Sequence, residues 1–111
     1  NLGGALLARM DDGNNYRGWD LWLEGGRLGM HVISAWPEDA MKVVTREALR
    51  PNQWHHVTVV YNGNSNVTGL RIYIDGELKP TDTQANQLKS SIRTTVPLKI
   101  GQRHTSSALD N

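Results

Sequence analysis

Short runs of alternating apolar and polar residues, separated by turn-forming residues, make up most of the chain. Residues 5–10 are apolar and end at the turn-forming stretch 11–15, residues 53–61 and 69–74 are the strongest β-type runs, and residues 97–101 are a last short one. A period of two is typical of strands with one buried face. Many short strands and almost no helical pattern predict an antiparallel all-β sandwich.

The segments on either side of Gly25-Gly26 predict a hairpin with a defined register. If these glycines form the turn, counting outward pairs Glu24 with Arg27 and Asp20 with His31. Alternate residues point to opposite faces. One face is apolar and contains Trp19, Leu21, Leu23, Leu28, Met30 and Val32. The other carries Asp20, Trp22, Glu24, Arg27 and His31. This partition predicts a sheet with one buried side.

Two segments carry mixed signals. Pro37-Glu38-Asp39 resembles a helix start, and helical spacing continues towards residue 50, whereas the β-branched run Val43-Val44-Thr45 favours a strand. We expect a strand over residues 40–45, although helix remains an alternative for residues 40–50. Residues 81–91 are polar and predict a long loop.

Length and composition narrow the classes of protein. A chain of 111 residues predicts a single domain, residues 1–111. The net charge of +1 comes from scattered basic residues, which argues against nucleic-acid binding. There is no cysteine, so disulfides and thiolate metal sites are excluded. No apolar run is long enough for membrane insertion, and no signal peptide is visible at the start.

Three motifs occur in order along the chain: Trp-His-His-Val-Thr-Val-Val-Tyr-Asn-Gly at residues 54–63, Leu-Arg-Ile-Tyr-Ile-Asp-Gly at residues 70–76 and Leu-Lys-Ile-Gly at residues 98–101. In these motifs the chain resembles the laminin-G-like, concanavalin A-like lectin/glucanase superfamily over nearly its whole length. The resemblance implies an antiparallel jelly-roll β-sandwich. Residues 6–10 and 16–21, His31 and Trp36-Pro37 are similar to the laminin-G-like module of large planctomycete proteins that also carry cytochrome c-like segments and domains of unknown function.

The resemblance also implies a trimmed domain. Members of the superfamily usually have further strands at both ends, so we expect terminal strands to be missing here and the chain to be part of a larger extracytoplasmic protein (periplasmic, cell-surface or secreted), beside neighbouring domains. Exposed strand edges invite pairing with another chain. We therefore expect an edge-strand or strand-swapped homo-oligomer.

Asp20, Trp22 and His31 are the most suggestive group of candidate ligand-binding residues. A carboxylate and an imidazole could hydrogen-bond the hydroxyls of a sugar while the indole stacks on its apolar face. The alternative, which the pattern favours, is a cross-strand polar pair on a solvated sheet, with Trp22 covering the gap left by Gly29.

Tyr16, Arg17 and Trp36 lie in or beside predicted loops, where binding groups are common. Trp36 precedes a proline, which favours an extended backbone that presents an aromatic platform. A loop tryptophan more often closes the end of a sandwich core, and this alternative is favoured.

Asp11, Asp12 and Asn14 offer oxygen ligands suited to calcium, a cation that some members of the superfamily bind. Their spacing fits no EF-hand, and these residues are ordinary turn formers, so a plain hairpin loop without metal or other cofactor is favoured. His55 and His56 are adjacent on a predicted strand and would point to opposite faces. They are therefore not expected to share one metal.

Glucanases of the superfamily carry their catalytic carboxylates as Glu-x-Asp-x-x-Glu on one strand, and no such spacing exists here. The sequence therefore favours a non-catalytic recognition module, with carbohydrate as the expected ligand. The alternative is a structural or protein–protein interaction domain that binds no sugar.

Overall fold

The structure is a computed structural model that describes residues 3–109, so residues 1–2 and 110–111 of the predicted domain lie outside the described residues. The described residues form antiparallel strands and one short 3-10 helix. The elements are β1 (Gly3–Asp11), β2 (Arg17–Glu24), β3 (Arg27–Ala35), β4 (Asp39–Thr45), β5 (Val57–Tyr61), η1 (Val67–Gly69), β6 (Leu70–Ile74), β7 (Glu77–Leu78), β8 (Thr81–Asn86) and β9 (Lys99–Ile100). Within this part of the chain, no helix has the length and hydropathy needed to cross a membrane.

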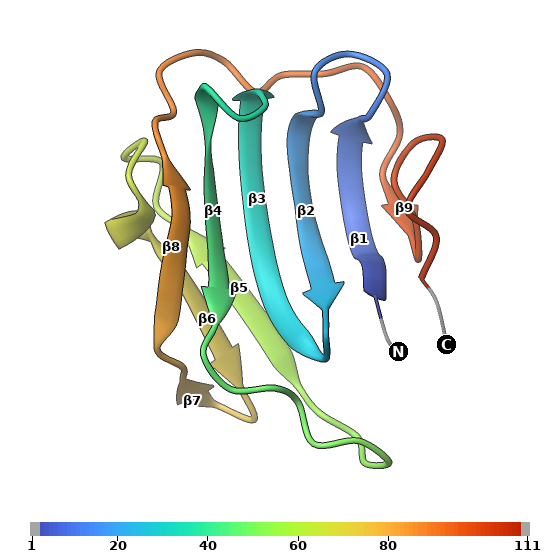
Figure 1. Ribbon diagram of the computed structural model, residues 1–111, viewed down its shortest axis with the longest axis vertical. Helices are drawn as coiled ribbons and strands as arrows, with labels where there is room; N and C mark the ends of the chain where they lie inside the picture. The colour runs from blue at the N-terminus through green and yellow to red at the C-terminus, as the bar shows by residue number, and fades with distance from the viewer. Residues whose placement is uncertain (1–2, 110–111) are drawn as a thin grey trace.

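The strands form two sheets, so the all-β sandwich prediction is confirmed. The larger sheet has six strands in the order β8-β4-β3-β2-β1-β9, and the smaller has three in the order β5-β6-β7 (Figure 1). The main core lies between the sheets, and its buried members come chiefly from β2, β3, β4 and β6. All six residues of the predicted apolar face belong to this core or pack against it.

The predicted hairpin register is confirmed pair by pair. Glu24 lies opposite Arg27 and Asp20 opposite His31, and the pairing continues to Gly18 opposite Ile33. Both turn glycines have positive φ, at 56° for Gly25 and 77° for Gly26. A two-residue hairpin turn that matches the sheet twist requires this conformation at both positions, and glycine adopts it readily.

The ambiguous segment after Pro37 is a strand, β4, which confirms the prediction for residues 40–45. The predicted loop at residues 81–91 is wrong in its first half, because Thr81–Asn86 forms the edge strand β8 paired with β4. The side chains of β8 are mostly exposed, so this strand needs no apolar pattern. Its backbone hydrogen bonds with β4 stabilise the strand conformation, although its polar residues have little preference for it.

Two other predicted strands are shorter than expected. The run at residues 53–61 becomes strand only at Val57, and the run at residues 97–101 forms only the two-residue strand β9. Backbone bonds at the two ends of β5, from Asp75 N to His56 O (2.7 Å) and from Asn62 N to Gly69 O (3.1 Å), show that its even-numbered residues bond to β6. The odd-numbered residues of β5 therefore direct their backbone groups towards the other edge, where no described strand pairs with them.

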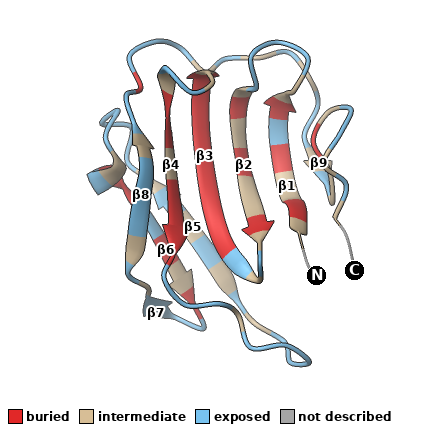
Figure 2. Ribbon diagram, in the orientation of Figure 1, coloured by how far each residue is buried: buried red, intermediate tan, exposed pale blue. Residues whose placement is uncertain are grey.

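The predicted polar face of β2 and β3 is buried at its centre. Asp20 is 0% exposed and His31 is 5% exposed. Figure 2 shows β3 buried along most of its length, and the chain after β9 returns beside β1. A second cluster of buried residues, Ala5, Ala8, Met10, Ile33 and Ala40, lies here, with Trp22 and Trp36 packed against it. The expectation of a solvated face was wrong at Asp20 and His31, because a segment distant in sequence covers this part of it.

Candidate functional site

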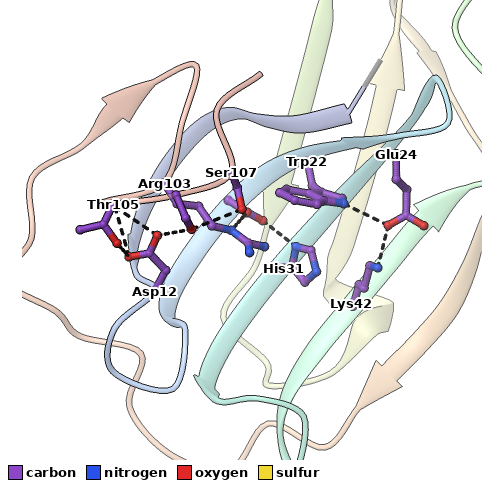
Figure 3. A network of polar contacts seen from close by, with 10 residues as sticks. Asp12, Trp22, Glu24, His31, Lys42, Arg103, Thr105 and Ser107 are labelled. Carbon is purple, nitrogen blue, oxygen red and sulfur yellow. Dashed lines mark hydrogen bonds and ion pairs between the residues drawn. The ribbon is translucent and has the colours of Figure 1, made fainter. Parts of the chain in front are cut away.

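A buried ionic group lies at the centre of this covered face. His31 Nδ1 lies 2.6 Å from Asp20 Oδ1, and Arg103 Nε donates to Asp20 Oδ2 at 2.9 Å. The register of β2 and β3 places Asp20 opposite His31, whereas Arg103 arrives from the segment after β9 (Figure 3). One carboxylate thus ties the hairpin to the C-terminal segment.

The arrangement fixes which nitrogen of His31 carries the proton. A carboxylate paired with a guanidinium is ionised and can only accept hydrogen bonds. His31 Nδ1 must therefore donate to Asp20, and in the neutral ring Nε2 is left as an acceptor. Among the described residues no hydrogen bond involves Nε2, and this nitrogen is not among the buried atoms that lack a partner. We infer that Nε2 is accessible to solvent or to a ligand.

Aromatic rings surround the ionic group. The Arg103 guanidinium lies 4.3 Å from the centroid of the Trp22 ring and 5.4 Å from that of Tyr16, both within cation–π range. The His31 ring stands edge-on to Trp22 at 5.7 Å and to Trp36 at 5.5 Å between centroids. The peptide bond between Trp36 and Pro37 is cis.

A second polar group lies at the edge of the same face. Glu24 Oε1 accepts hydrogen bonds from Trp22 Nε1 at 3.0 Å and from Lys42 Nζ at 2.7 Å (Figure 3). Partial burial would raise the pKa of Glu24, but the hydrogen bonds and the charge of Lys42 outweigh burial and lower it. Glu24 is therefore a stable carboxylate near neutral pH.

These side chains line an open hollow of about 260 Å³, which we call the aromatic hollow. Its lining residues are Tyr16, Trp22, Glu24, His31, Trp36, Lys42 and Arg103. Tyr16, Trp22, His31 and Trp36 were expected from the sequence as ligand-binding candidates, and Asp20 lies behind them, bonded to His31 and Arg103. Arg17 does not line the hollow, because its Nε donates to the Ser34 carbonyl oxygen at 3.1 Å. Trp22 also lies beside Gly29, as predicted.

Three lining residues were missed as site candidates from the sequence. Glu24 was placed on the correct face but not in the site. Lys42 lies opposite His31 in the β3–β4 pairing. If the position of the turn between these strands were known from the sequence, counting outward from it would place Lys42 beside His31. Arg103 is 83 residues from Asp20 in sequence, and no local pattern indicates that pairing.

The calcium candidates lie in the turn between β1 and β2. Both carboxylate oxygens of Asp12 accept hydrogen bonds from the Thr105 backbone, at 3.2 and 3.1 Å, and Ser106 Oγ and Thr105 Oγ1 bond to it as well. Burial would raise the pKa of Asp12, but these hydrogen bonds outweigh it and lower it. Within residues 3–109 no group of three or more His, Asp or Glu side chains could hold a metal ion. The structure uses Asp12 to hold the C-terminal segment, whereas neither Asp11 nor Asn14 takes part in this contact.

The adjacent histidines His55 and His56 precede β5 and form a loop contact. His55 Nδ1 lies 2.9 Å from Asp75 Oδ2, and His55 Nε2 lies 2.8 Å from the Arg50 carbonyl oxygen. The hydrogen bond with Asp75 is the main cause that raises the pKa of His55 above its ordinary value. Trp54, beside them, is 99% exposed and belongs to no core.

The comparisons with known proteins give one match. The model of the family described as "Concanavalin A-like lectin/glucanases superfamily" matches residues 2–110. Neither the curated proteins nor the solved structures contain a match to this chain.

Proposed function

Since the chain belongs to the concanavalin A-like lectin/glucanases superfamily, we propose that it is a non-catalytic β-sandwich recognition module that binds carbohydrate in the aromatic hollow. The observation that carries the proposal is the lining of the hollow. Three aromatic rings stand beside charged and polar groups within about 260 Å³. Sugars present apolar C–H faces and hydroxyl edges, and a site of this mixed composition suits both.

The state of the two carboxylates at the hollow supports a non-catalytic role. A glycosidase needs one carboxyl that stays protonated as the general acid. Asp20 is paired with Arg103, and the pKa of Glu24 is lowered rather than raised. Both groups are therefore suited to holding structure and poorly suited to giving up a proton to a leaving group.

Tryptophan fluorescence during titration with a panel of oligosaccharides tests the proposal. Trp36→Ala should weaken binding by about tenfold or more, because the ring forms one wall of the hollow. Trp54→Ala is the matched control and should bind like the wild type, since Trp54 is exposed and lies outside the hollow. The proposal fails if no sugar binds, or if both variants bind as tightly as the wild type.

We propose further that the module works outside the cytoplasm, as one domain of a larger protein. This expectation comes from the resemblance to extracytoplasmic laminin-G-like modules and from the motifs that carry it. Fractionation of cells expressing the full-length protein tests the location, and recovery of the protein in the cytoplasm would contradict it.

A specific feature favours a second candidate function, protein–protein interaction between copies of this chain. The free edge of β5 directs the backbone groups of Val57, Val59 and Tyr61 outwards, and β5 carries no charged residue that would oppose pairing. Beside β5 lies an apolar hollow of about 280 Å³ that includes Trp19, Val59 and Ile92 in its lining. Pairing of two β5 edges would satisfy the free backbone groups.

Light scattering at increasing concentration tests this association. The wild type should form dimers, and Val59→Pro should remain monomeric because proline removes an outward N–H without breaking a bond to β6. Val59→Thr, which keeps the N–H, is the control and should dimerise. A wild type that stays monomeric at high concentration excludes the association.

A further inference from the structure

The charged groups at the aromatic hollow are balanced within its own walls. Lys42 pairs with Glu24 at 2.7 Å, and Arg103 pairs with Asp20 at 2.9 Å. These are two cations and two carboxylates, so the hollow has no excess charge when His31 is neutral. A charged ligand would therefore find no unpaired charge of opposite sign in the hollow, and partial burial of a charge without its own counter-charge carries an energetic penalty.

The aromatic hollow offers both hydrogen-bond donors and an acceptor that its own ion pairs do not use. Lys42 and Arg103 each have N–H groups beyond those used in these two ion pairs, and Nε2 of the neutral His31 ring is an acceptor with no partner among the described residues. A hydroxyl both donates and accepts, whereas a carboxylate or sulfate oxygen only accepts. A hydroxyl therefore suits both kinds of atom, whereas a carboxylate or sulfate group facing Nε2 would leave it without a partner.

His31 is held in position for this role. Its side chain is 6% exposed, its Nδ1 is fixed by Asp20 at 2.6 Å, and its ring stands between those of Trp22 and Trp36. The ring cannot turn without breaking the bond to Asp20. An acceptor fixed in this way loses little conformational entropy on binding.

We propose, on the basis of the proposed carbohydrate function, that the aromatic hollow selects neutral sugars and that His31 Nε2 accepts a hydrogen bond from one ligand hydroxyl. Asp20 acts as the positioning residue, because it holds the proton on Nδ1 and leaves the lone pair on Nε2. The aromatic rings of the hollow provide the surface for the apolar face of the sugar.

The first test needs no variant. The wild-type protein is titrated with neutral oligosaccharides and with uronic-acid and sulfated oligosaccharides of the same length. Neutral sugars should bind more tightly than their acidic counterparts at neutral pH. Tighter binding of the acidic sugars would overturn the inference while leaving carbohydrate binding intact. Absence of binding to every sugar would overturn both.

The second test separates the role of His31 in binding from its role in packing. The amide of His31→Asn takes the place of Nδ1, so it can still donate to Asp20, but nothing replaces Nε2. Binding of neutral sugars should fall by about tenfold, the usual effect of losing one hydrogen bond, while the contact with Asp20 remains. His31→Gln is the complementary variant, because its longer side chain reaches towards Nε2 and gives up the contact with Asp20. It should lose stability and keep more of the binding than His31→Asn.

Comparing the two variants shows whether His31 contacts the ligand or only stabilises the fold. Weaker binding in His31→Asn than in His31→Gln, with the opposite order of stability, supports the inference. If binding in both variants follows stability alone, His31 has only a structural role and the inference is wrong. In that case Trp36→Ala would still report on carbohydrate binding in the hollow, so failure of this inference and failure of the proposed function remain distinguishable.

Discussion

Replacement of Arg103 by methionine should destabilise the protein severely. The Asp20 side chain is 0% exposed, and Arg103 pairs a guanidinium, which is always charged, with its carboxylate. Methionine keeps the unbranched aliphatic part of the side chain, removes the guanidinium that lies over Trp22 and Tyr16, and leaves the carboxylate with His31 as its remaining partner. Removing one partner of a buried ion pair costs about 3–5 kcal/mol. The hydrogen bond from His31 remains, so we expect the lower end of that range.

Urea unfolding followed by tryptophan fluorescence measures the effect. A loss of about 3 kcal/mol would lower the midpoint by roughly 2 M at an unchanged slope. Arg46→Met is the matched control, because its ion pair with Asp82 is exposed on both sides and should contribute less than about 1 kcal/mol. The double variant Asp20→Asn/Arg103→Met removes both charges and should be more stable than Arg103→Met alone. An Arg103→Met protein within about 1 kcal/mol of the wild type would refute the reasoning.

Three further predictions concern other parts of the fold. Gly18→Ala should cost at least about 2 kcal/mol in unfolding experiments, because Gly18 has φ of 131° and a Cβ there would clash with the backbone carbonyl oxygen of Arg9 in β1. The hydrogen bond with Asp75 raises the pKa of His55 above 6.5. The protonated His55 therefore stabilises the folded protein fully below about pH 6.5, and this stabilisation is lost as the pH rises through the raised pKa. Between about pH 6 and pH 9 the melting temperature of His55→Asn should therefore fall by less than that of the wild type. An equal fall in the two proteins would contradict this. Asp12→Ala should release the C-terminal segment, seen as faster hydrogen exchange at the Thr105 amide, while unchanged exchange would show that other contacts hold it.

The parts of the fold that were predictable from sequence are those set by local patterns. Gly25-Gly26 fixes the turn, and the alternation on either side then fixes every partner in the β2–β3 pairing, including Asp20 opposite His31. The strand at residues 40–45 was also predictable, because β-branched residues outweighed the helical spacing. In each case a short stretch of chain contained all the information needed.

The parts that escaped prediction depend on contacts between distant segments. β8 is polar and becomes a strand only because β4 offers an edge to pair with. The face that carries Asp20 is buried because Arg103 and its neighbours return to it from the end of the chain. A period of two shows that two faces differ, but it does not show which segment will cover the polar one.

Because the segment after β9 covers this face with Arg103, stability and recognition depend on the same side chain. Arg103 neutralises Asp20 and also stacks on Trp22 in the wall of the aromatic hollow, so weaker binding in an Arg103 variant would not identify a ligand contact. Lys42 offers a cleaner test, because its partner Glu24 is partly exposed and water can solvate the carboxylate when the amine is removed. If Lys42→Met loses sugar binding at unchanged stability, the edge of the hollow contacts the ligand directly. If it loses neither, recognition rests on His31 and the aromatic rings, and the pair of Lys42 and Glu24 serves only to hold Trp22 in place.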